Sequence, residues 1–256
     1  MANAEILAIE RAAFEAWPAA EVVPLGGWRL RFNHGVTQRA SSVWPGPGAS
    51  EIPLAARIHA AERFYAERGA AASFQLSPAA DPLELDAALA LRGYEASPHP
   101  VSVEIAAPAP LATWALPRGV EALCADALSE EWFELSGRQG RFRGAEALVY
   151  RALLERLAGP AGFALVRVGG RATAVGLGVV APPWAGVFSM LTLPAQRGRR
   201  LGEAVLGAIA RWAQGRGASR LYLQVESDNA AARRLYARAG FVPRYAYHYR
   251  RRAQTR

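Results

Sequence analysis

The amino-acid sequence predicts an α/β protein built from two similar halves. Segments with apolar residues at helical spacing alternate along the chain with shorter segments that have the period of strands, as expected when helices pack against sheets. The order helix, strand, helix, Gly, aromatic residue also occurs twice. Arg63–Ala70 resembles Arg211–Ala218, and Leu91–Tyr94 resembles Arg238–Phe241 at nearly the same spacing. Chance similarity in an Ala- and Arg-rich chain is the alternative, but the shared order of elements favours a tandem of whole domains.

The first half combines amphipathic helices with alternating strands. Trp28–Phe32 alternates at period two, as a half-buried strand does, and Gly93 ends a helix that has Pro82 in its first turn. Ala106–Pro110 is typical of a linker. We expect helices over residues 4–17, 51–68 and 81–93, and strands over residues 27–32, 39–44, 73–76 and 101–105. These signals predict a first domain over residues 1–105, a linker over 106–117 and a second domain over 118–256.

The second half has the pattern of a larger sheet covered by helices. We expect helices over residues 119–136, 144–158, 201–214 and 229–239, and strands over residues 163–168, 173–180, 187–193, 219–225 and 241–250. Residues 172–196 carry no charge, which raises the question of a membrane span. Pro182-Pro183 in the middle of this segment favours two buried strands joined by a turn.

Composition describes a folded protein with a basic surface. Hydrophobic residues make up 52% of the 256 positions, and the net charge is +8. All 30 basic residues are Arg, so compositional bias explains the charge as well as selection for nucleic acid does. Cys124 is the sole cysteine and the four histidines have no ligand spacing, so we expect neither a disulfide nor a metal site. The N-terminus lacks the features of a signal peptide, which predicts a cytoplasmic protein.

Gln196–Gly202 predicts a phosphate-binding loop. An apolar strand ending at Pro194 precedes it, and a helix follows, with apolar residues 205, 206, 209 and 212 on one side. Such a loop directs several backbone N–H groups and the positive end of a helix to one point, which suits a phosphate. The alternative for this loop alone is a solvated basic turn.

A second motif downstream favours the phosphate-binding interpretation of this loop over the solvated turn. Leu221–Phe241 reads as a strand ending in Val, then Asn229, Ala232, Leu235-Tyr236 and Gly240-Phe241. With the Arg-rich loop before it, this segment resembles the GCN5-related N-acetyltransferase superfamily over roughly residues 120–250. The stretch Trp28–Trp44 is also similar to the amino-terminal region of some bacterial two-part members. The resemblance implies tandem domains, each a mixed central sheet flanked by helices, with the amino-terminal one degenerate.

The resemblance also implies acetyl-CoA as co-substrate and a set of residues that bind it. A backbone N–H at Met190–Leu191 would stabilise the oxyanion, and Leu191 and Leu193 would pair with the pantetheine arm. Asn229 would bond the pantetheine. The complete cofactor-binding set is Met190, Leu191, Leu193, Gln196, Arg197, Gly198, Arg199, Arg200, Leu201, Gly202, Asn229, Ala232 and Tyr236.

Catalysis needs a proton donor for the departing thiolate and a base for the amine. Tyr236 matches the family's general acid, and its alternative is a core aromatic residue. Glu226, just beyond a strand end, is the first candidate for the base, with a surface carboxylate as its alternative. Glu134 is a second candidate, on the substrate side, and Tyr247 on the terminal strand would shape the acceptor pocket or pack in the core.

Two positions depart from the family pattern. Arg200 stands where the loop motif usually has its first Gly, and its side chain must either point outward or close the cradle. In the first half, the repeat places Leu89 at the position of Tyr236, and no basic loop occurs around Gly48–Glu51. The first half is therefore expected to be catalytically silent and to cover the second or form a wall of the acceptor cleft.

These features predict an acetyl-CoA-dependent N-acetyltransferase that moves an acetyl group directly to a primary amine. The acceptor would be a small molecule or a peptide, and the protein a monomer or homodimer that binds no membrane. Two alternatives keep the same fold without catalysis. One is a basic module that binds nucleic acid, and the other is a sensor of acyl-CoA.

Overall fold

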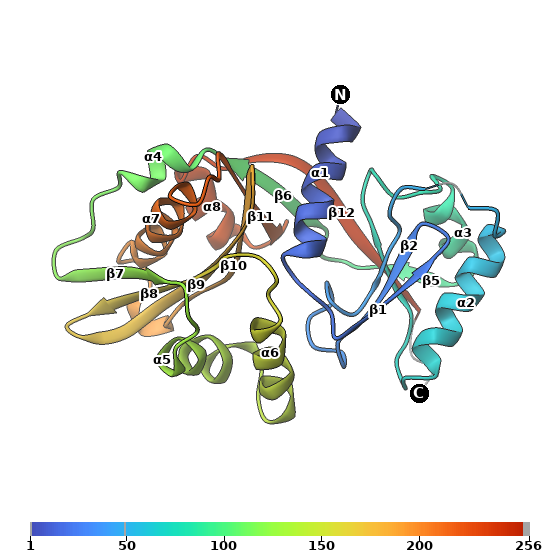
Figure 1. Ribbon diagram of the computed structural model, residues 1–256, viewed down its shortest axis with the longest axis horizontal. Helices are drawn as coiled ribbons and strands as arrows, with labels where there is room; N and C mark the ends of the chain where they lie inside the picture. The colour runs from blue at the N-terminus through green and yellow to red at the C-terminus, as the bar shows by residue number, and fades with distance from the viewer. Residues whose placement is uncertain (1, 49, 253–256) are drawn as a thin grey trace.

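A continuous path of hydrogen-bonded strands runs through both halves of the chain. In the computed structural model, which describes residues 2–48 and 50–252, the strand order is β1-β2-β3-β4-β12-β6-β11-β10-β9-β8-β7, and β5 pairs with β12. Figure 1 shows the halves as two lobes, with α1 standing between them and the long strands β6 and β12 running from one to the other.

The elements follow one another in the order that the alternating pattern predicts. The first half contains α1 (Ala2–Glu15), β1 (Glu21–Leu25), β2 (Trp28–Phe32), β3 (Val43–Trp44), α2 (Leu54–Ala66), β4 (Ser73–Leu76), α3 (Leu85–Leu91), β5 (Tyr94–Ala96), β6 (Val101–Ala106) and α4 (Pro108–Ala112). The second half contains β7 (Val120–Ala125), α5 (Glu130–Phe133), the π-helix η1 (Glu134–Arg141), α6 (Ala145–Glu155), β8 (Ala161–Val168), β9 (Arg171–Ala181), β10 (Trp184–Thr192), the 3₁₀ turn η2 (Pro194–Gln196), α7 (Leu201–Gln214), β11 (Arg220–Glu226), α8 (Ala230–Arg238) and β12 (Val242–Arg252).

The two halves share one topology. In the first half β1, β2 and β3 are antiparallel neighbours, α2 crosses over, and β4 then pairs parallel to β3. In the second half β8, β9 and β10 are antiparallel, α7 crosses over, and β11 pairs parallel to β10. Each parallel strand is followed by a helix that ends before a Gly, α3 or α8. The predicted tandem of mixed sheets flanked by helices is confirmed.

The halves exchange strands. β6, from the first half, lies between β11 and β12 in the second sheet, with Leu223 opposite Glu104 and Tyr245 opposite Val103. β12 then continues past the second sheet, and its last residues pair with β4 and β5 of the first. Each half therefore completes the sheet of the other, which fixes the two lobes relative to each other.

Three sequence expectations were wrong. Residues 120–125 form strand β7 and not the start of a helix, because this segment pairs along its length with β8 at the sheet edge. Residues 108–112, expected in a linker, form α4, whose fully buried Leu111 packs beneath α7. The strand expected over 39–44 is reduced to Val43–Trp44, and β1, with its alternating burial, was missed.

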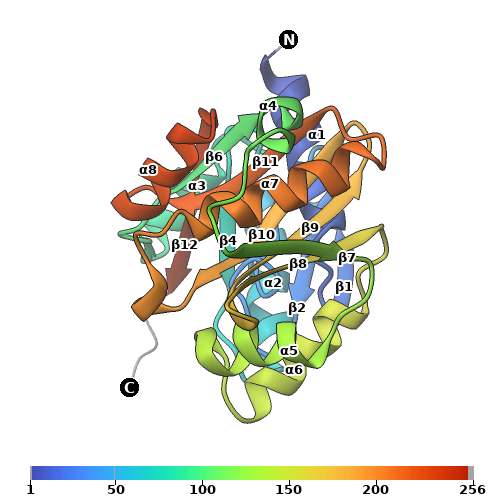
Figure 2. The same cartoon turned by 90° about the vertical axis from the view of Figure 1, so that its left-hand side faces the viewer.

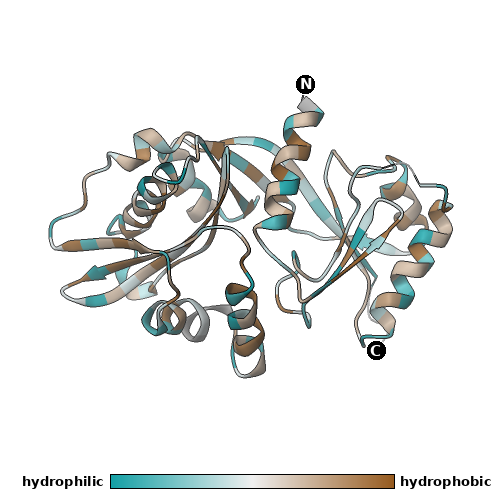
Figure 3. Ribbon diagram, viewed as in Figure 1, coloured by the Kyte–Doolittle hydropathy of each residue, from teal (hydrophilic) through white to brown (hydrophobic). Residues whose placement is uncertain are grey.

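The second sheet has two apolar faces that different helices cover. α4, α7 and α8 lie on one face and bury Leu221, Leu223 and Val225 of β11, as Figure 2 shows for α7. α1, α5 and α6 lie on the other face, over Phe188 and Tyr222. Figure 3 shows the strands between these layers as the most apolar part of this lobe. We refer to the two sides as the α7 face and the α1 face.

The uncharged segment 172–196 forms β9 and β10, joined at Pro182-Pro183. Two buried strands and a turn were predicted here, and this prediction is confirmed. Among the described residues, no helix combines the length and the hydropathy needed to cross a bilayer.

Candidate active site

The two parallel strands of the second sheet separate where the site was predicted. β10 and β11 pair from Trp184 opposite Arg220 to Val187 opposite Leu223, and no pairing between them follows within the described residues. The remaining residues, 188–192 of β10 and 224–226 of β11, form the two sides of what we call the wedge. Carboxyl ends of neighbouring parallel strands are where ligands bind in open α/β sheets. The wedge is therefore the natural place for an extended ligand.

A β-bulge shapes the β10 side of the wedge. Phe188 lies opposite Leu177 of β9, and the next paired residue, Leu191, lies opposite Val175, so β10 contains one extra residue. Ser189 has a φ of 49°, a conformation that non-glycine residues rarely adopt. Ser189 and Met190 thus have no partner in the ladder with β9. The break in the ladder lies at the strand edge where an oxyanion-binding N–H is predicted for Met190–Leu191, and that role stays a prediction.

Tyr150 of α6 fixes the bulge. Its hydroxyl lies 2.7 Å from the Ser189 hydroxyl and 3.1 Å from that of Ser136 in η1. Burial raises the pKa of Tyr150, so its hydroxyl stays protonated in this chain of hydrogen bonds. Sequence reasoning missed Tyr150 because nothing in its amphipathic helix distinguishes it from a core aromatic residue.

The loop before α7 offers a row of unpaired donors. In the described part of the chain, the backbone N–H groups of residues 198–202 have no hydrogen-bond acceptor. These residues lie before and within the first turn of α7, a helix of 14 residues. The positive end of the helix dipole therefore adds to the attraction of the N–H groups for an anion. Gln196 accepts a hydrogen bond from Arg199, and Arg197 is exposed. Such a row of donors suits a phosphate, and its role as a pyrophosphate site stays a prediction.

Arg200 does not close this cradle. It has a left-handed backbone (φ 59°, ψ 19°), which explains why the motif usually places Gly here. Its Nε donates to Glu203 Oε2 at 2.5 Å, and Arg238 Nε donates to Glu203 Oε1 at 3.2 Å. The Glu203 side chain is 8% exposed and holds Arg200 back along α7, so the departure from the motif leaves the N–H groups accessible.

Tyr236 lies on the α7 face of the sheet, in α8. It packs against Phe241 with ring centroids 5.8 Å apart and is 8% exposed. Burial, and then the charge of Glu104, raise the pKa of Tyr236 to about 12. Glu104 belongs to β6 from the first half, is 2% exposed, and lies 3.6 Å from Arg233 Nε. Sequence reasoning missed Glu104 because its position depends on the strand exchange.

Asn229 has a structural role, whereas its contact with the pantetheine arm stays a prediction. It is the N-cap of α8, where its Oδ1 accepts from the backbone N–H of Ala232 at 3.1 Å. Its own N–H donates to the Glu226 carbonyl at 3.0 Å, so the chain turns directly from the wedge into the helix. The cap fixes where α8 begins, and thereby the position of Tyr236 two turns later.

The remaining predicted residues lie on the α1 face. Glu226 is the exposed last residue of β11. Its side chain lies on the same side of the strand as those of Tyr222 and Gln224. Tyr247 is buried on β12 and donates to Gln224 Oε1 at 2.7 Å, which brings it to the wedge. Glu134 opens η1 between α5 and α6. Leu191 and Leu193 pack partly buried against the core of this face.

Among its described residues, the first half lacks equivalents of Tyr236 and of the basic loop. Leu89 is fully buried in α3, in the place that corresponds to Tyr236, and has no polar atom for proton transfer. β3 ends at Trp44, immediately before Pro45-Gly46-Pro47-Gly48. No basic loop was expected in residues 48–51. Ala49 lies outside the described residues, and Ser50 and Glu51 carry no positive charge.

The parallel wedge, the bulge, the phosphate-type loop and the tyrosine on α8 define a GCN5-related N-acetyltransferase. The chain belongs to the family described as "Probable histone acetyltransferase Rv0428c C-terminal", whose profile matches residues 3–250. It is 30% identical over 268 residues to the uncharacterized N-acetyltransferase YobR of Bacillus subtilis, covering 96% of this chain and 98% of that one. The protein is therefore an acyltransferase.

Solved structures share the fold at low sequence identity. A GCN5-related N-acetyltransferase from Kribbella flavida superimposes with a TM-score of 0.70 at 18% identity, over 98% of this chain and 95% of that one. A tandem protein of the same superfamily from the clavulanic acid biosynthesis pathway has a TM-score of 0.62 at 16% identity, over 77% and 68% of the two chains. The second likeness matches the repeated topology.

Proposed function

We propose that the second half binds acetyl-CoA along the wedge and transfers its acetyl group directly to a primary amine. The observation that carries this proposal is the coincidence of three features at one place. The strands separate at residues 188–192 and 224–226, five consecutive N–H groups lie free at 198–202, and a protonated tyrosine lies on the α7 face. An extended thioester with a pyrophosphate at one end matches all three.

The residues divide the work of the reaction. The amine nitrogen forms a bond to the thioester carbonyl carbon, the C–S bond breaks, the nitrogen loses a proton and the sulfur gains one. A free N–H at the bulge, at Met190, would donate to the carbonyl oxygen as negative charge develops on it. The Tyr236 hydroxyl would donate to the departing sulfur, and Glu226 would accept the proton from the amine.

The two faces of the sheet separate the two proton transfers. Tyr236, in α8, packs on the α7 face with Leu223 and Val225. Glu226 lies on the α1 face, because residues of β11 alternate between the faces and it follows Val225. The acceptor would therefore approach from the α1 side, between the halves, while CoA leaves along the loop. In this arrangement the first half acts as a wall of the acceptor site, without a cofactor of its own.

A thiol-release assay with purified full-length protein tests this proposal. Acetyl-CoA is combined with a panel of amino acids, decarboxylated amines, polyamines and lysine peptides, the last because the family description names a histone acetyltransferase. We expect free CoA and an acetylated amine in equal amounts with at least one class. Binding of acetyl-CoA without thiol release across the panel would favour a sensor. Salt-sensitive binding of DNA or RNA, with no binding of acetyl-CoA, would favour the nucleic-acid alternative.

A further inference from the structure

Three buried donor groups have no partner on the α1 face of the second sheet, at the wedge and in the paired region just before it. Within the described residues, Arg39 Nε, the Tyr222 hydroxyl and Gln224 Nε2 are buried and make no hydrogen bond. Tyr222 and Gln224 are alternate residues of β11 and point to the same side. Leaving a buried donor unpaired costs free energy, and native proteins rarely do so without a reason.

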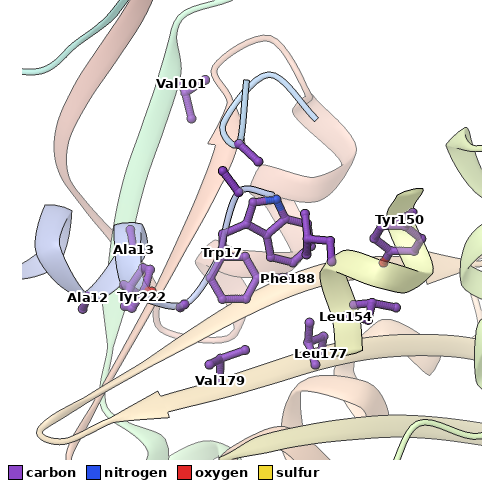
Figure 4. Packing of buried hydrophobic residues seen from close by; sticks show 14 of the residues in the cluster. Ala12, Ala13, Trp17, Val101, Tyr150, Leu154, Leu177, Val179, Phe188 and Tyr222 are labelled. Carbon is purple, nitrogen blue, oxygen red and sulfur yellow. The ribbon is translucent and has the colours of Figure 1, made fainter. Parts of the chain in front are cut away.

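Arg39 brings the first half to this place. It lies in the segment between β2 and β3, and its guanidinium sits 5.5 Å from the ring centroid of Phe188 and 5.9 Å from that of Trp17. Figure 4 shows Trp17 stacked on Phe188 with Tyr222 close by. The Phe188 and Tyr222 ring centroids are 6.0 Å apart. Phe188 thus has the guanidinium and Tyr222 as neighbours, and the charge of Arg39 acts on the Tyr222 hydroxyl, lowering the pKa that burial raises.

No carboxylate of the described residues neutralises Arg39 by an ion pair. The buried carboxylate of Glu10, on which the charge of Arg39 acts, already accepts hydrogen bonds from Trp44, Gln75 and Tyr245. Tyr247 donates to Gln224 Oε1, which leaves the amide nitrogen of Gln224 facing outward from that bond. The guanidinium of Arg39 interacts with the Tyr247 hydroxyl, but its Nε stays unpaired, so the cluster consists of three unpaired donors beside a positive charge that has no carboxylate partner among the described residues.

We propose that the acceptor carries a carboxylate, and that Arg39, Tyr222 and Gln224 bind it. A carboxylate only accepts hydrogen bonds and has about four lone-pair directions, so one group can pair with all three donors. Gln224 is the first residue of β11 beyond the paired region, at the mouth of the wedge. If this carboxylate belongs to the acceptor, an amine a few bonds away in the same molecule would lie beside the bulge. A small amino acid has both groups at this spacing.

This assignment rests on the proposed acetyl transfer, and matched acceptors test it. In the thiol-release assay each amino acid is compared with its decarboxylated amine and its amide. We expect kcat/KM to be at least tenfold higher for the preferred amino acid than for either partner. In Arg39→Met, which keeps an unbranched stem against Phe188, this ratio should fall toward one. Arg11→Met, at an exposed position on α1, serves as the matched control and should keep the ratio.

A binding readout separates this assignment from the proposed function. N-acetyl amino acids and their amides are added to CoA-loaded protein, and the melting temperature is measured for wild type and Arg39→Met. We expect a shift with the carboxylate form only, and its loss in the variant. Equal effects of both forms, no effect of either, or a preference for lysine peptides would overturn the carboxylate assignment. If CoA itself causes no shift in melting temperature and no thiol is released, the proposed acetyl transfer is wrong, and the carboxylate assignment falls with it.

Discussion

Replacing Tyr236 with phenylalanine is expected to lower kcat by roughly a hundredfold or more, with little change in the affinity for acetyl-CoA. The hydroxyl makes no hydrogen bond to the described protein residues, so its removal leaves no partner unpaired. The free energy of unfolding should therefore change by less than about 1 kcal/mol. Thiol release under saturating acetyl-CoA measures the first effect, and urea unfolding measures the second.

The pH profile adds a second expectation for Tyr236. Because burial and Glu104 raise its pKa to about 12, the phenol keeps its proton at the pH, about 10, at which a primary amine loses its own. Ionisation of Tyr236 should then cause no fall in rate below about pH 10, the ordinary pKa of a phenol. Tyr94→Phe, a buried tyrosine in β5 of the first half, is the control and should keep full turnover. Equal turnover of Tyr236→Phe and wild type would remove Tyr236 from the reaction.

Replacing Glu10 with alanine is expected to lower the free energy of unfolding by about 3 kcal/mol. Glu10 is 2% exposed in α1, and its two oxygens accept from Trp44 Nε1 at 3.1 Å, Gln75 Nε2 at 3.3 Å and the Tyr245 hydroxyl at 2.5 Å. These donors come from β3, β4 and β12. The variant leaves all three unpaired at the junction of the halves. Chemical denaturation at neutral pH measures the loss.

Glu10→Gln separates hydrogen bonding from charge. Its carbonyl can accept from Trp44 and Gln75, and its amide can donate to the Tyr245 oxygen, so most of the network survives. Burial raises the pKa of Glu10 above 4.5, so the wild type gains stability from this group below pH 4.5 and loses it as pH rises through the folded-state pKa. Glu10→Gln should therefore become more stable relative to wild type as pH rises. Glu15→Ala, exposed at the end of α1, should stay within about 0.5 kcal/mol of wild type, and an equal loss there would contradict the role of Glu10.

Local signals predicted the elements to which we assign the co-substrate site. The bounds predicted for α7, 201–214, agree with Leu201–Gln214, because its apolar positions all face one sheet and Gly-containing segments flank it. The strand before it and the Asn229–Tyr236 helix after it were predicted for similar reasons. The signals for these elements are helical spacing, caps and turns. Each involves residues that are close together in the chain, so they can be recognised in the sequence.

What depends on distant pairing was not predicted. Glu104 reaches Tyr236 only because β6 inserts between β11 and β12, and nothing in Val101–Ala106 indicates which sheet it will join. Arg39 reaches Phe188 across the junction of the halves for the same reason. The sequence therefore indicates the proposed chemistry of the second half but not the contacts that the first half makes with it.

The stoichiometry of acetyl-CoA binding, measured by isothermal titration calorimetry, tests the central claim most directly. One cradle of free N–H groups in the second half, and Leu89 with no basic loop in the first, predict one molecule of acetyl-CoA per chain. Binding should be retained in Tyr236→Phe, which keeps the wedge and the loop. No binding, or two equivalent molecules per chain, would contradict the assignment of a single acetyl-CoA site to residues 188–202 and 224–236.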